Sequence, residues 1–158
     1  MTLAINLSIA KPPPLEDYQK PQDEQVNGWI YLLETTSDSL RFKLGRTGLE
    51  NPLVRYLQLR TGDPGLLFRV AYLVPTDTWK LSMIESAMHN QFGDQILFHD
   101  DTRSEWFNGN PESAQMLLEG WLEELFDTQI SDTFGESVIW RAYDWHFRND
   151  MKYWPEFA

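Results

Sequence analysis

The sequence predicts an α+β fold in which a small sheet of three strands, antiparallel or mixed, is flanked by helices. The chain has 158 residues, about the length of one domain, and it is 42% hydrophobic and 14% aromatic, which is enough for a sizeable core. In its middle, strand-like and helix-like segments follow one another in the order β-β-α-β-α. The sequence has no cysteine, which excludes disulfides and thiolate sites, and no apolar run approaches the roughly 18 residues of a membrane span.

The first two strands and the first helix are predicted from local signals. Two short apolar runs, residues 29–34 and 41–45, flank a polar loop, which is typical of an antiparallel hairpin. A helix is expected next, because Asn51 is a good N-cap, Pro52 suits the first helical position and Gly62 suits the position after the C-cap.

The following elements are read from composition and spacing. Residues 66–74, LLFRVAYLV, have the β-branched and aromatic content of a third strand. Asp77 is a candidate cap for a second helix, whose apolar positions follow helical spacing: Leu81, Ile84, Met88 and Phe92. Residues 99–109 predict a loop or a short strand, and Pro111 begins a further helix.

Residues 1–27 predict an extended arm in front of the central domain, residues 28–110. The arm has four prolines among many polar residues, so it cannot form a helix interior or a central strand. Its mildly apolar start, residues 2–10, fits either an edge strand or a segment that docks on a partner.

Residues 111–158 predict an acidic extension made of a helix and an aromatic tail. In the tail, Trp140, Tyr143 and Phe147 have helical spacing, whereas Tyr143, Trp145 and Phe147 alternate as in a strand, and both interpretations stay open. The aromatic side chains need a surface to bury against, which is either the chain's own domain or another protein.

The formal charge of −11 is spread unevenly along the chain. Residues 111–158 contain ten Asp and Glu against three Lys and Arg, while residues 28–110 contain ten against eight. This balance weighs against a protein that binds nucleic acid by charge alone, since such proteins are usually basic.

A set of polar residues is distributed over the regular elements of the middle. Tyr31 and Lys43 lie on the two strands of the hairpin, and Arg55 lies on the first helix. Glu85 and His89 are four residues apart on the second helix, so they share one face.

With these residues in place, the middle of the chain resembles the GIY-YIG nuclease superfamily. Trp29-Ile30-Tyr31 stands where the family has Gly-Ile-Tyr, so that a tryptophan replaces the glycine. Lys43-Leu44-Gly45, followed by Arg46-Thr47, resembles the Lys-Ile-Gly-x-Thr motif of a branch common in phages and bacteria. The resemblance covers roughly residues 28–110 and continues through these further elements: Arg55 with LQLRTG, Glu85-x-x-x-His89-x-x-Phe92, and Glu105-Trp106-Phe107.

This resemblance implies a metal-dependent endonuclease that hydrolyses DNA phosphodiester bonds. It implies one divalent cation, Mg²⁺ or Mn²⁺, held by Glu85, and a forked contact from Arg55 to the scissile phosphate. Tyr31 would activate or orient the attacking water, and we expect Lys43 to face it across the hairpin and to lower its pKa, a task that the metal could also perform.

Four further residues receive expected roles beside these. Arg46 would contact the substrate phosphate. Glu105 would contact the residues that bind the metal or the substrate without binding either itself. His89 would donate to the leaving oxygen or orient Glu85 or Tyr31, unless it is simply a structural histidine. Asn108 is a candidate for the asparagine that many members of the family place next to the tyrosine.

The extension supports competing interpretations. The chain could instead be a non-catalytic binding or assembly module on the same scaffold, in a phage particle or a toxin–immunity pair, with residues 111–158 contacting a protein partner or a second copy. A weaker alternative is that the acidic face mimics DNA. We expect no membrane association and a cytoplasmic location in a bacterial or phage-infected cell, or a place in the virion if the assembly alternative holds.

Overall fold

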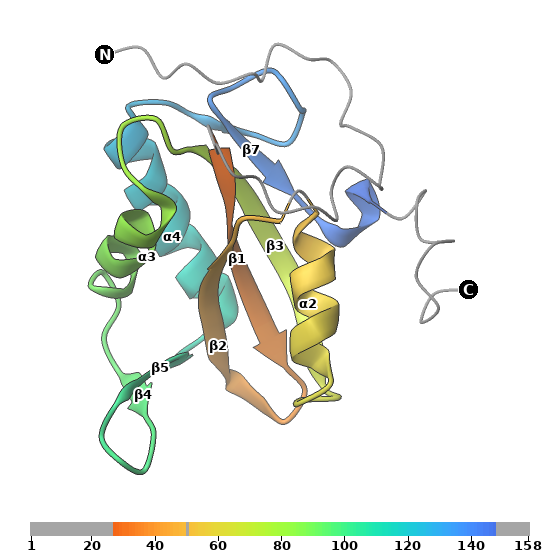
Figure 1. Ribbon diagram of the computed structural model, residues 1–158, viewed down its shortest axis with the longest axis vertical. Helices are drawn as coiled ribbons and strands as arrows, with labels where there is room; N and C mark the ends of the chain where they lie inside the picture. Colours follow the sequence, from red (N-terminus) through yellow and green to blue (C-terminus); the bar gives the residue numbers. More distant parts are fainter. Residues whose placement is uncertain (1–26, 50, 148–158) are drawn as a thin grey trace.

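The computed structural model describes residues 27–49 and 51–147 (Figure 1). The predicted arm, apart from Asn27, lies outside the described residues, and so does the possible edge strand at its start. The strands have these bounds: β1 Asn27–Thr35, β2 Asp38–Thr47, β3 Leu66–Pro75, β4 Gln95–Leu97, β5 Arg103–Asn108, β6 Ile130–Ser131 and β7 Ile139–Ala142. The helices are α2 Pro52–Arg60, α3 Leu81–His89, α4 Pro111–Phe126 and the 3₁₀ turn η1 Asp144–His146.

The α+β class is confirmed, but the sheet is larger than the three strands expected. It contains seven strands in the order β4-β5-β2-β1-β3-β7-β6 within the described residues. Neighbouring strands are antiparallel except β6 and β7, which are parallel, so the sheet is mixed. The four added strands are two to six residues long, which is short for periodicity to reveal. Of these, β5 lies within residues 99–109, where a loop or a short strand was expected.

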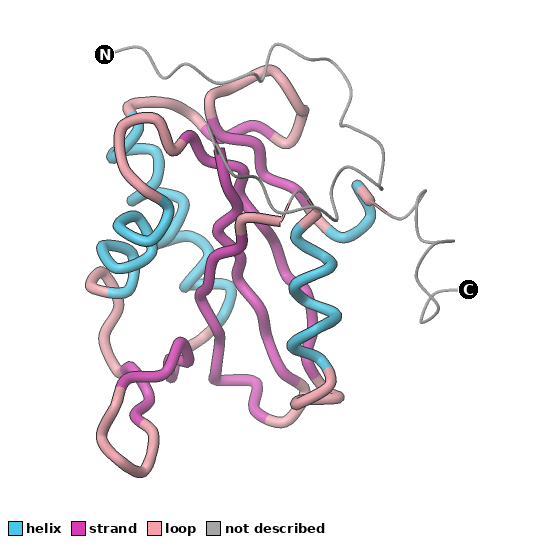
Figure 2. The backbone as a smooth tube through the Cα atoms, viewed as in Figure 1, coloured by secondary structure: helices cyan, strands magenta, loops and turns pink. Residues whose placement is uncertain are grey.

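Strand β1 lies at the centre of the sheet and divides its side chains between two apolar layers. Trp29, Tyr31 and Leu33 pack in the layer that contains α2, while Ile30 and Leu32 pack in the layer that contains α3 and α4. This alternation follows from the two-residue period of a strand. Figure 2 shows the sheet between these helices, with α2 apart from the other two.

Strand β2 has neighbours on both sides for only part of its length. It pairs with β1 as far as Thr47, but with β5 only at Arg41, Phe42 and Lys43. Past Lys43, the second half of β2 forms an edge of the described sheet. Side chains from both faces can therefore meet around this edge, which is where the polar residues gather.

The first helix begins as predicted, and the second does not. Asn51 caps α2, since its Oδ1 accepts a hydrogen bond from the Leu53 N–H at 2.9 Å. Asp77 as the cap of the second helix is wrong, because α3 starts at Leu81 and its N-cap position is Lys80, which makes no capping side-chain bond. Leu81 is buried under the sheet, so tertiary packing sets this start.

The last apolar position predicted for the second helix lies outside it. Helix α3 ends at His89, but the Phe92 ring still packs in the same core, 5.5 Å from the Phe42 ring and 5.8 Å from the Phe107 ring between centroids. Spacing had correctly identified Phe92 as a core residue while assigning it to the wrong element.

The aromatic tail contains a strand followed by a 3₁₀ turn. Strand β7 holds Trp140 and pairs with β3, and the turn η1 holds the exposed Trp145. Trp140 and Phe147 pack against Trp29, with ring centroids 5.6 and 5.9 Å apart. The described part of the tail therefore buries Trp140 and Phe147 on its own domain.

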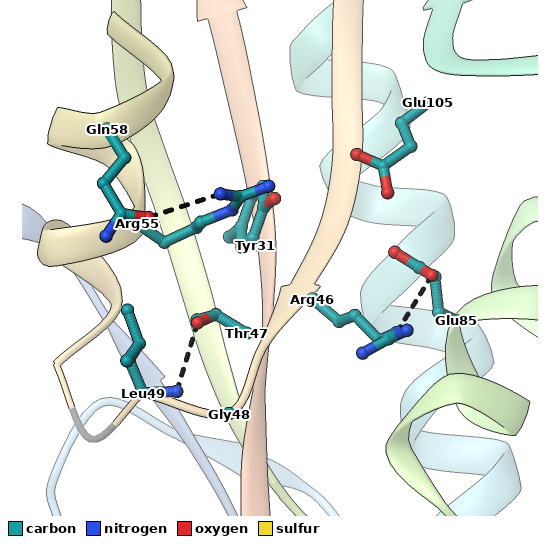
Figure 3. Close-up of a pocket in the computed structure, with 9 residues that line it drawn as sticks. All are labelled: Tyr31, Arg46, Thr47, Gly48, Leu49, Arg55, Gln58, Glu85 and Glu105. Atoms are coloured by element: carbon teal, nitrogen blue, oxygen red, sulfur yellow. Dashed lines mark hydrogen bonds and ion pairs between the residues drawn. The ribbon is translucent and has the colours of Figure 1, made fainter. Parts of the chain in front are cut away.

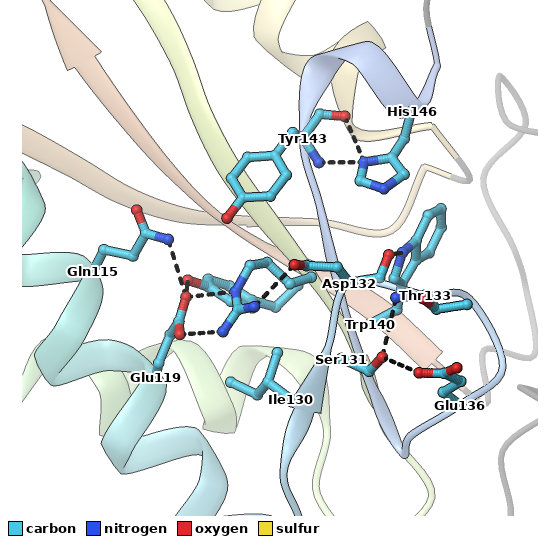
Figure 4. Close-up of polar contacts among 12 residues, drawn as sticks. Gln115, Glu119, Ile130, Ser131, Asp132, Thr133, Glu136, Trp140, Tyr143 and His146 are labelled. Carbon is cyan, nitrogen blue, oxygen red and sulfur yellow. Dashed lines mark hydrogen bonds and ion pairs between the residues drawn. The ribbon is translucent and has the colours of Figure 1, made fainter.

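A network of polar side chains joins β7 to α4 and to β3 (Figure 4). Arg141 on β7 forms a forked ion pair with Glu119 on α4, and it also donates to Asp132 at 2.9 Å. Tyr72 and Gln115 donate to the same Glu119 carboxylate at 2.6 and 3.0 Å. Burial opposes ionisation of Glu119, but these hydrogen bonds outweigh it and hold the pKa of that carboxyl below its usual range.

We expect Arg141→Ala to lower the free energy of unfolding by about 2–3 kcal/mol, somewhat less than the loss of a fully buried pair, because both partners keep a little solvent contact. The substitution leaves Glu119 charged and without its cation. Urea unfolding followed by circular dichroism measures the change, beside Arg103→Ala at an exposed position of β5, for which we expect at most about 0.5 kcal/mol. Equal effects of the two substitutions would contradict this role.

None of the described helices combines the length and the apolar character needed to cross a membrane.

Candidate functional site

An open pocket of about 420 Å³ lies around the free edge of β2 (Figure 3). Five of the residues singled out in the sequence line it: Tyr31, Arg46, Arg55, Glu85 and Glu105. They come from β1, β2, α2, α3 and β5, which are far apart in the sequence. The structure thus brings into one place side chains that the sequence presented on separate elements.

Gly45 makes the position of Tyr31 possible. The two residues are directly paired across β1 and β2. A Cβ atom on Gly45 would lie 2.3 Å from the Tyr31 Oη and 2.4 Å from its Cζ, so the ring lies across the bare backbone of Gly45. The glycine of the Lys-Leu-Gly motif is therefore required by close approach, which is a common structural use of this residue.

The Tyr31 hydroxyl is in its neutral form in this pocket. Burial raises its pKa far above the ordinary value and the nearby Glu105 raises it further, while the Arg55 guanidinium, which donates to the hydroxyl, lowers it by less. Figure 3 shows Arg55 reaching from α2 to the Tyr31 hydroxyl, and its Nη1 also donates to Gln58 Oε1 at 3.3 Å. A neutral phenol can orient a water molecule, but it is a poor proton acceptor.

The expected pairing of Lys43 with Tyr31 is corrected by the structure. Lys43 is opposite Leu33 in the hairpin, and its Nζ forms an ion pair with Glu105 Oε2 at 2.8 Å. This contact arises because β5 pairs with β2 at Lys43 and Trp106 and so places Glu105 within reach. Lys43 therefore acts on the carboxylate of the pocket and not on the phenol.

Glu85 and Glu105 form a carboxyl pair in which the pKa of Glu85 is raised and that of Glu105 is lowered. Burial raises the pKa of Glu85 to about 7, with the charge of Glu105 as the next cause and Arg46 acting in the opposite direction. Burial also opposes ionisation of Glu105, but the hydrogen bond and charge of Lys43 outweigh it and hold its pKa below the usual range. Near neutral pH, Glu85 is thus partly protonated while Glu105 is ionised.

These two carboxyls fit a hard divalent cation. Glu85 Oε2 is buried without a hydrogen-bond partner in the described part of the chain, and Figure 3 shows the Glu105 carboxylate pointing toward Glu85. Carboxylates this close repel each other unless a proton or a cation lies between them, and their oxygens suit Mg²⁺ or Mn²⁺. The described residues hold no cluster of three or more potential metal-ligating side chains, so water and substrate oxygens would complete the coordination.

His89 and Asn108 do not line the pocket. The ring nitrogen Nε2 of His89 donates to the Leu44 carbonyl at 2.9 Å, and the ring lies beside Phe107. Asn108 is exposed at the end of β5, where its backbone N–H donates to the Asp94 carbonyl. These positions match the structural interpretation of His89, and they place Asn108 away from Tyr31.

Sequence reasoning gave no role to the remaining residues of the pocket wall, although two of them, Thr47 and Gln58, lie in the motifs quoted for the resemblance. Gln58 lies one turn after Arg55 on α2 and holds its guanidinium, a relation that the i, i+3 spacing could have indicated. Thr47, Gly48 and Leu49 line the wall between β2 and α2, where Thr47 Oγ1 accepts from the Leu49 N–H at 3.1 Å. No sequence signal marked Gly48 or Leu49 as part of a site.

Comparison with known protein families gives one match. The model of one family, the T5orf172 domain, matches residues 28–122, which is more than half of the chain. The chain belongs to the T5orf172 domain family. The match contains every residue that lines the pocket, and it ends within α4, before the β6–β7–η1 extension. Neither a curated protein nor a solved structure matched this T5orf172 domain protein.

Proposed function

We propose that this T5orf172 domain protein is a metal-dependent endonuclease of the GIY-YIG type that hydrolyses DNA phosphodiester bonds. One observation carries the proposal: two arginines, two carboxyls and a tyrosine from five separate elements line a single open pocket. Arg55 contacts Gln58 and Tyr31, which are uncharged, so its guanidinium can receive an anion in this pocket. The nuclease-associated family of the chain agrees with this function.

Each side chain has a task that its surroundings support. Arg55 is held by Gln58 and offers its guanidinium to a phosphate oxygen, as forked recognition of a phosphate requires. The Tyr31 hydroxyl, neutral and fixed over Gly45, orients the attacking water. Glu105, which Lys43 keeps ionised, is an acceptor for a hydrogen bond from that water.

Glu85 is the side chain that would hold the cation, with Glu105 beside it. A bound Mg²⁺ or Mn²⁺ would supply positive charge to the phosphate oxygens and to the leaving oxygen. The unpartnered Oε2 of Glu85 is the atom that this cation would satisfy. Binding of the cation requires that the proton on Glu85 is released, so we expect the affinity to rise as the pH rises through about 7.

The alternative of a non-catalytic binding module has weaker support. It was motivated by the aromatic side chains of the acidic tail, but Trp140 and Phe147 are buried against the domain itself. Trp145, which is 59% exposed, is the main aromatic side chain that the described part of the tail presents to solvent.

Plasmid cleavage tests the proposal. We expect the purified protein to nick or linearise supercoiled DNA at low salt with Mg²⁺ or Mn²⁺, and to lose this activity in EDTA. Glu85→Ala should reduce the rate by at least about 10²-fold, because the cation loses its main protein ligand. Glu124→Ala, which removes an exposed carboxylate of α4, is the matched control and should cleave normally.

Two results would contradict the proposal in different ways. Cleavage that persists in Glu85→Ala would show that the activity comes from another site or a contaminant. The absence of cleavage under every condition, by a folded protein, would favour the binding module.

A further inference from the structure

Arg46 forms an ion pair with Glu85, the residue that would hold the metal. Its Nε donates to Glu85 Oε1 at 3.1 Å, across the space between the edge of β2 and α3 (Figure 3). The Arg46 side chain is 44% exposed, whereas that of Glu85 is 14% exposed. Arg46 is therefore the partner with room to move into solvent, while Glu85 is largely enclosed by the protein.

The other cations near the pocket have different partners. Lys43 is paired with Glu105, and Arg55 contacts Gln58 and Tyr31. Arg46 is thus the cation that neutralises Glu85 among the described residues for which an ion pair is recorded. A divalent cation on Glu85 would lie beside the Arg46 guanidinium, and charges of the same sign repel strongly in a partly buried site.

We propose that Arg46 is a latch on Glu85, which the phosphodiester of the nucleic acid withdraws as it enters the pocket. This inference rests on the proposed function, and it adds that binding of the nucleic acid promotes binding of the cation. The free protein holds the cation weakly, because Arg46 competes for the Glu85 carboxylate. A phosphate at the pocket mouth offers Arg46 another anion, and Glu85 then becomes free to hold the cation.

Two consequences follow from the Arg46 latch. The divalent cation and the nucleic acid bind with positive coupling, since each favours the same released position of Arg46. Arg46 also stays paired with Glu85 when no substrate is present, so the metal site becomes complete only when the substrate binds. Arg46 is a positioning residue in the metal-free state and a phosphate contact in the complex.

The test measures Mn²⁺ affinity without nucleic acid. Protein freed of metal with EDTA is titrated with Mn²⁺, and the free ion is followed by electron paramagnetic resonance. We expect Arg46→Ala to bind Mn²⁺ about 5- to 10-fold more tightly than the wild type, near the lower end of usual coupling factors. Arg46→Lys, which keeps a cation in reach of Glu85, should bind nearly as the wild type does.

Arg41→Ala is the matched control for the loss of one positive charge. Arg41 lies on the same strand, and its ion pair is with Asp38, outside the pocket. If Arg46→Ala and Arg41→Ala bind Mn²⁺ equally, the latch is overturned while the metal site of the proposed function stands. If neither the wild type nor Arg46→Ala binds Mn²⁺, the metal site and the latch both fail.

A second measurement tests whether Arg46 contacts a phosphate in the complex with nucleic acid. Binding of a duplex oligonucleotide is measured over a range of salt concentrations in Ca²⁺ in place of Mg²⁺. Arg46→Ala should bind more weakly, and the slope of log affinity against log salt should fall by about one, as for one lost phosphate contact. An unchanged slope would overturn the phosphate-contact half of the inference.

Discussion

Replacing Glu85 with glutamine is expected to abolish cleavage and, at the same time, to make the protein more stable above pH 7. The two effects have one cause, which is the burial of a carboxyl beside Glu105. Ionised Glu85 is the form that would hold a cation. When no cation is bound, however, its buried charge lowers the free energy of unfolding. Glutamine keeps the shape and an oxygen that accepts from Arg46, but it carries no charge.

The sign of the pH dependence follows from the pKa of Glu85. Its value is about 7 in the folded protein, against 4.5 for an ordinary glutamate, so the folded state binds the proton more tightly. The contribution of Glu85 to the free energy of unfolding is therefore fully present below about pH 4.5, and it is lost as the pH rises through 7. Glu85→Gln removes this loss, so its relative stability increases over the same range.

Thermal unfolding in EDTA at pH 5 and pH 8 measures this difference. We expect Glu85→Gln to melt roughly 2–4 °C above the wild type at pH 8, the shift for about 1 kcal/mol in a chain of this size, and close to it at pH 5. Glu124→Gln, at an exposed position of α4, should show no such pH dependence. A variant that is inactive and less stable at both pH values would indicate that Glu85 is structural.

A methyl group on Gly45 is expected to remove activity and to destabilise the fold. The added Cβ would lie 2.3 Å from the Tyr31 Oη and 2.7 Å from Cε1, far inside van der Waals contact. Tyr31 is 2% exposed in an apolar layer, so the ring cannot move aside without disturbing its neighbours. We expect a loss of about 1–3 kcal/mol, as for other overpacked cores, and a hydroxyl displaced from Arg55.

Urea unfolding and plasmid cleavage test Gly45→Ala together. Gly120→Ala on α4 is the matched control, because its Cβ would meet nothing within 4 Å and alanine favours a helix by up to about 1 kcal/mol. Adding Tyr31→Phe to Gly45→Ala removes the closest atom, so it should restore part of the stability but none of the activity. A fully active Gly45→Ala would refute the role assigned to Tyr31.

Local signals determined several elements of this protein from the sequence by itself. The hairpin, the Asn51-Pro52 start of α2 and the Pro111 start of α4 depend on dihedral preferences and hydrogen bonds within a few residues. The candidate residues Tyr31 and Glu85 were found by motif order along the chain, which needs no knowledge of the contacts.

Tertiary structure decided the features that depend on strand pairing between distant segments. Lys43 reaches Glu105 and not Tyr31, because β5 adds to β2 beside it. Helix α3 begins at Leu81 and not after Asp77, because the sheet buries Leu81. The short β7 exists because β3 offers it an edge. A sequence records which groups are present, but their charges and neighbours are set by packing, and packing here joins residues that are tens of positions apart.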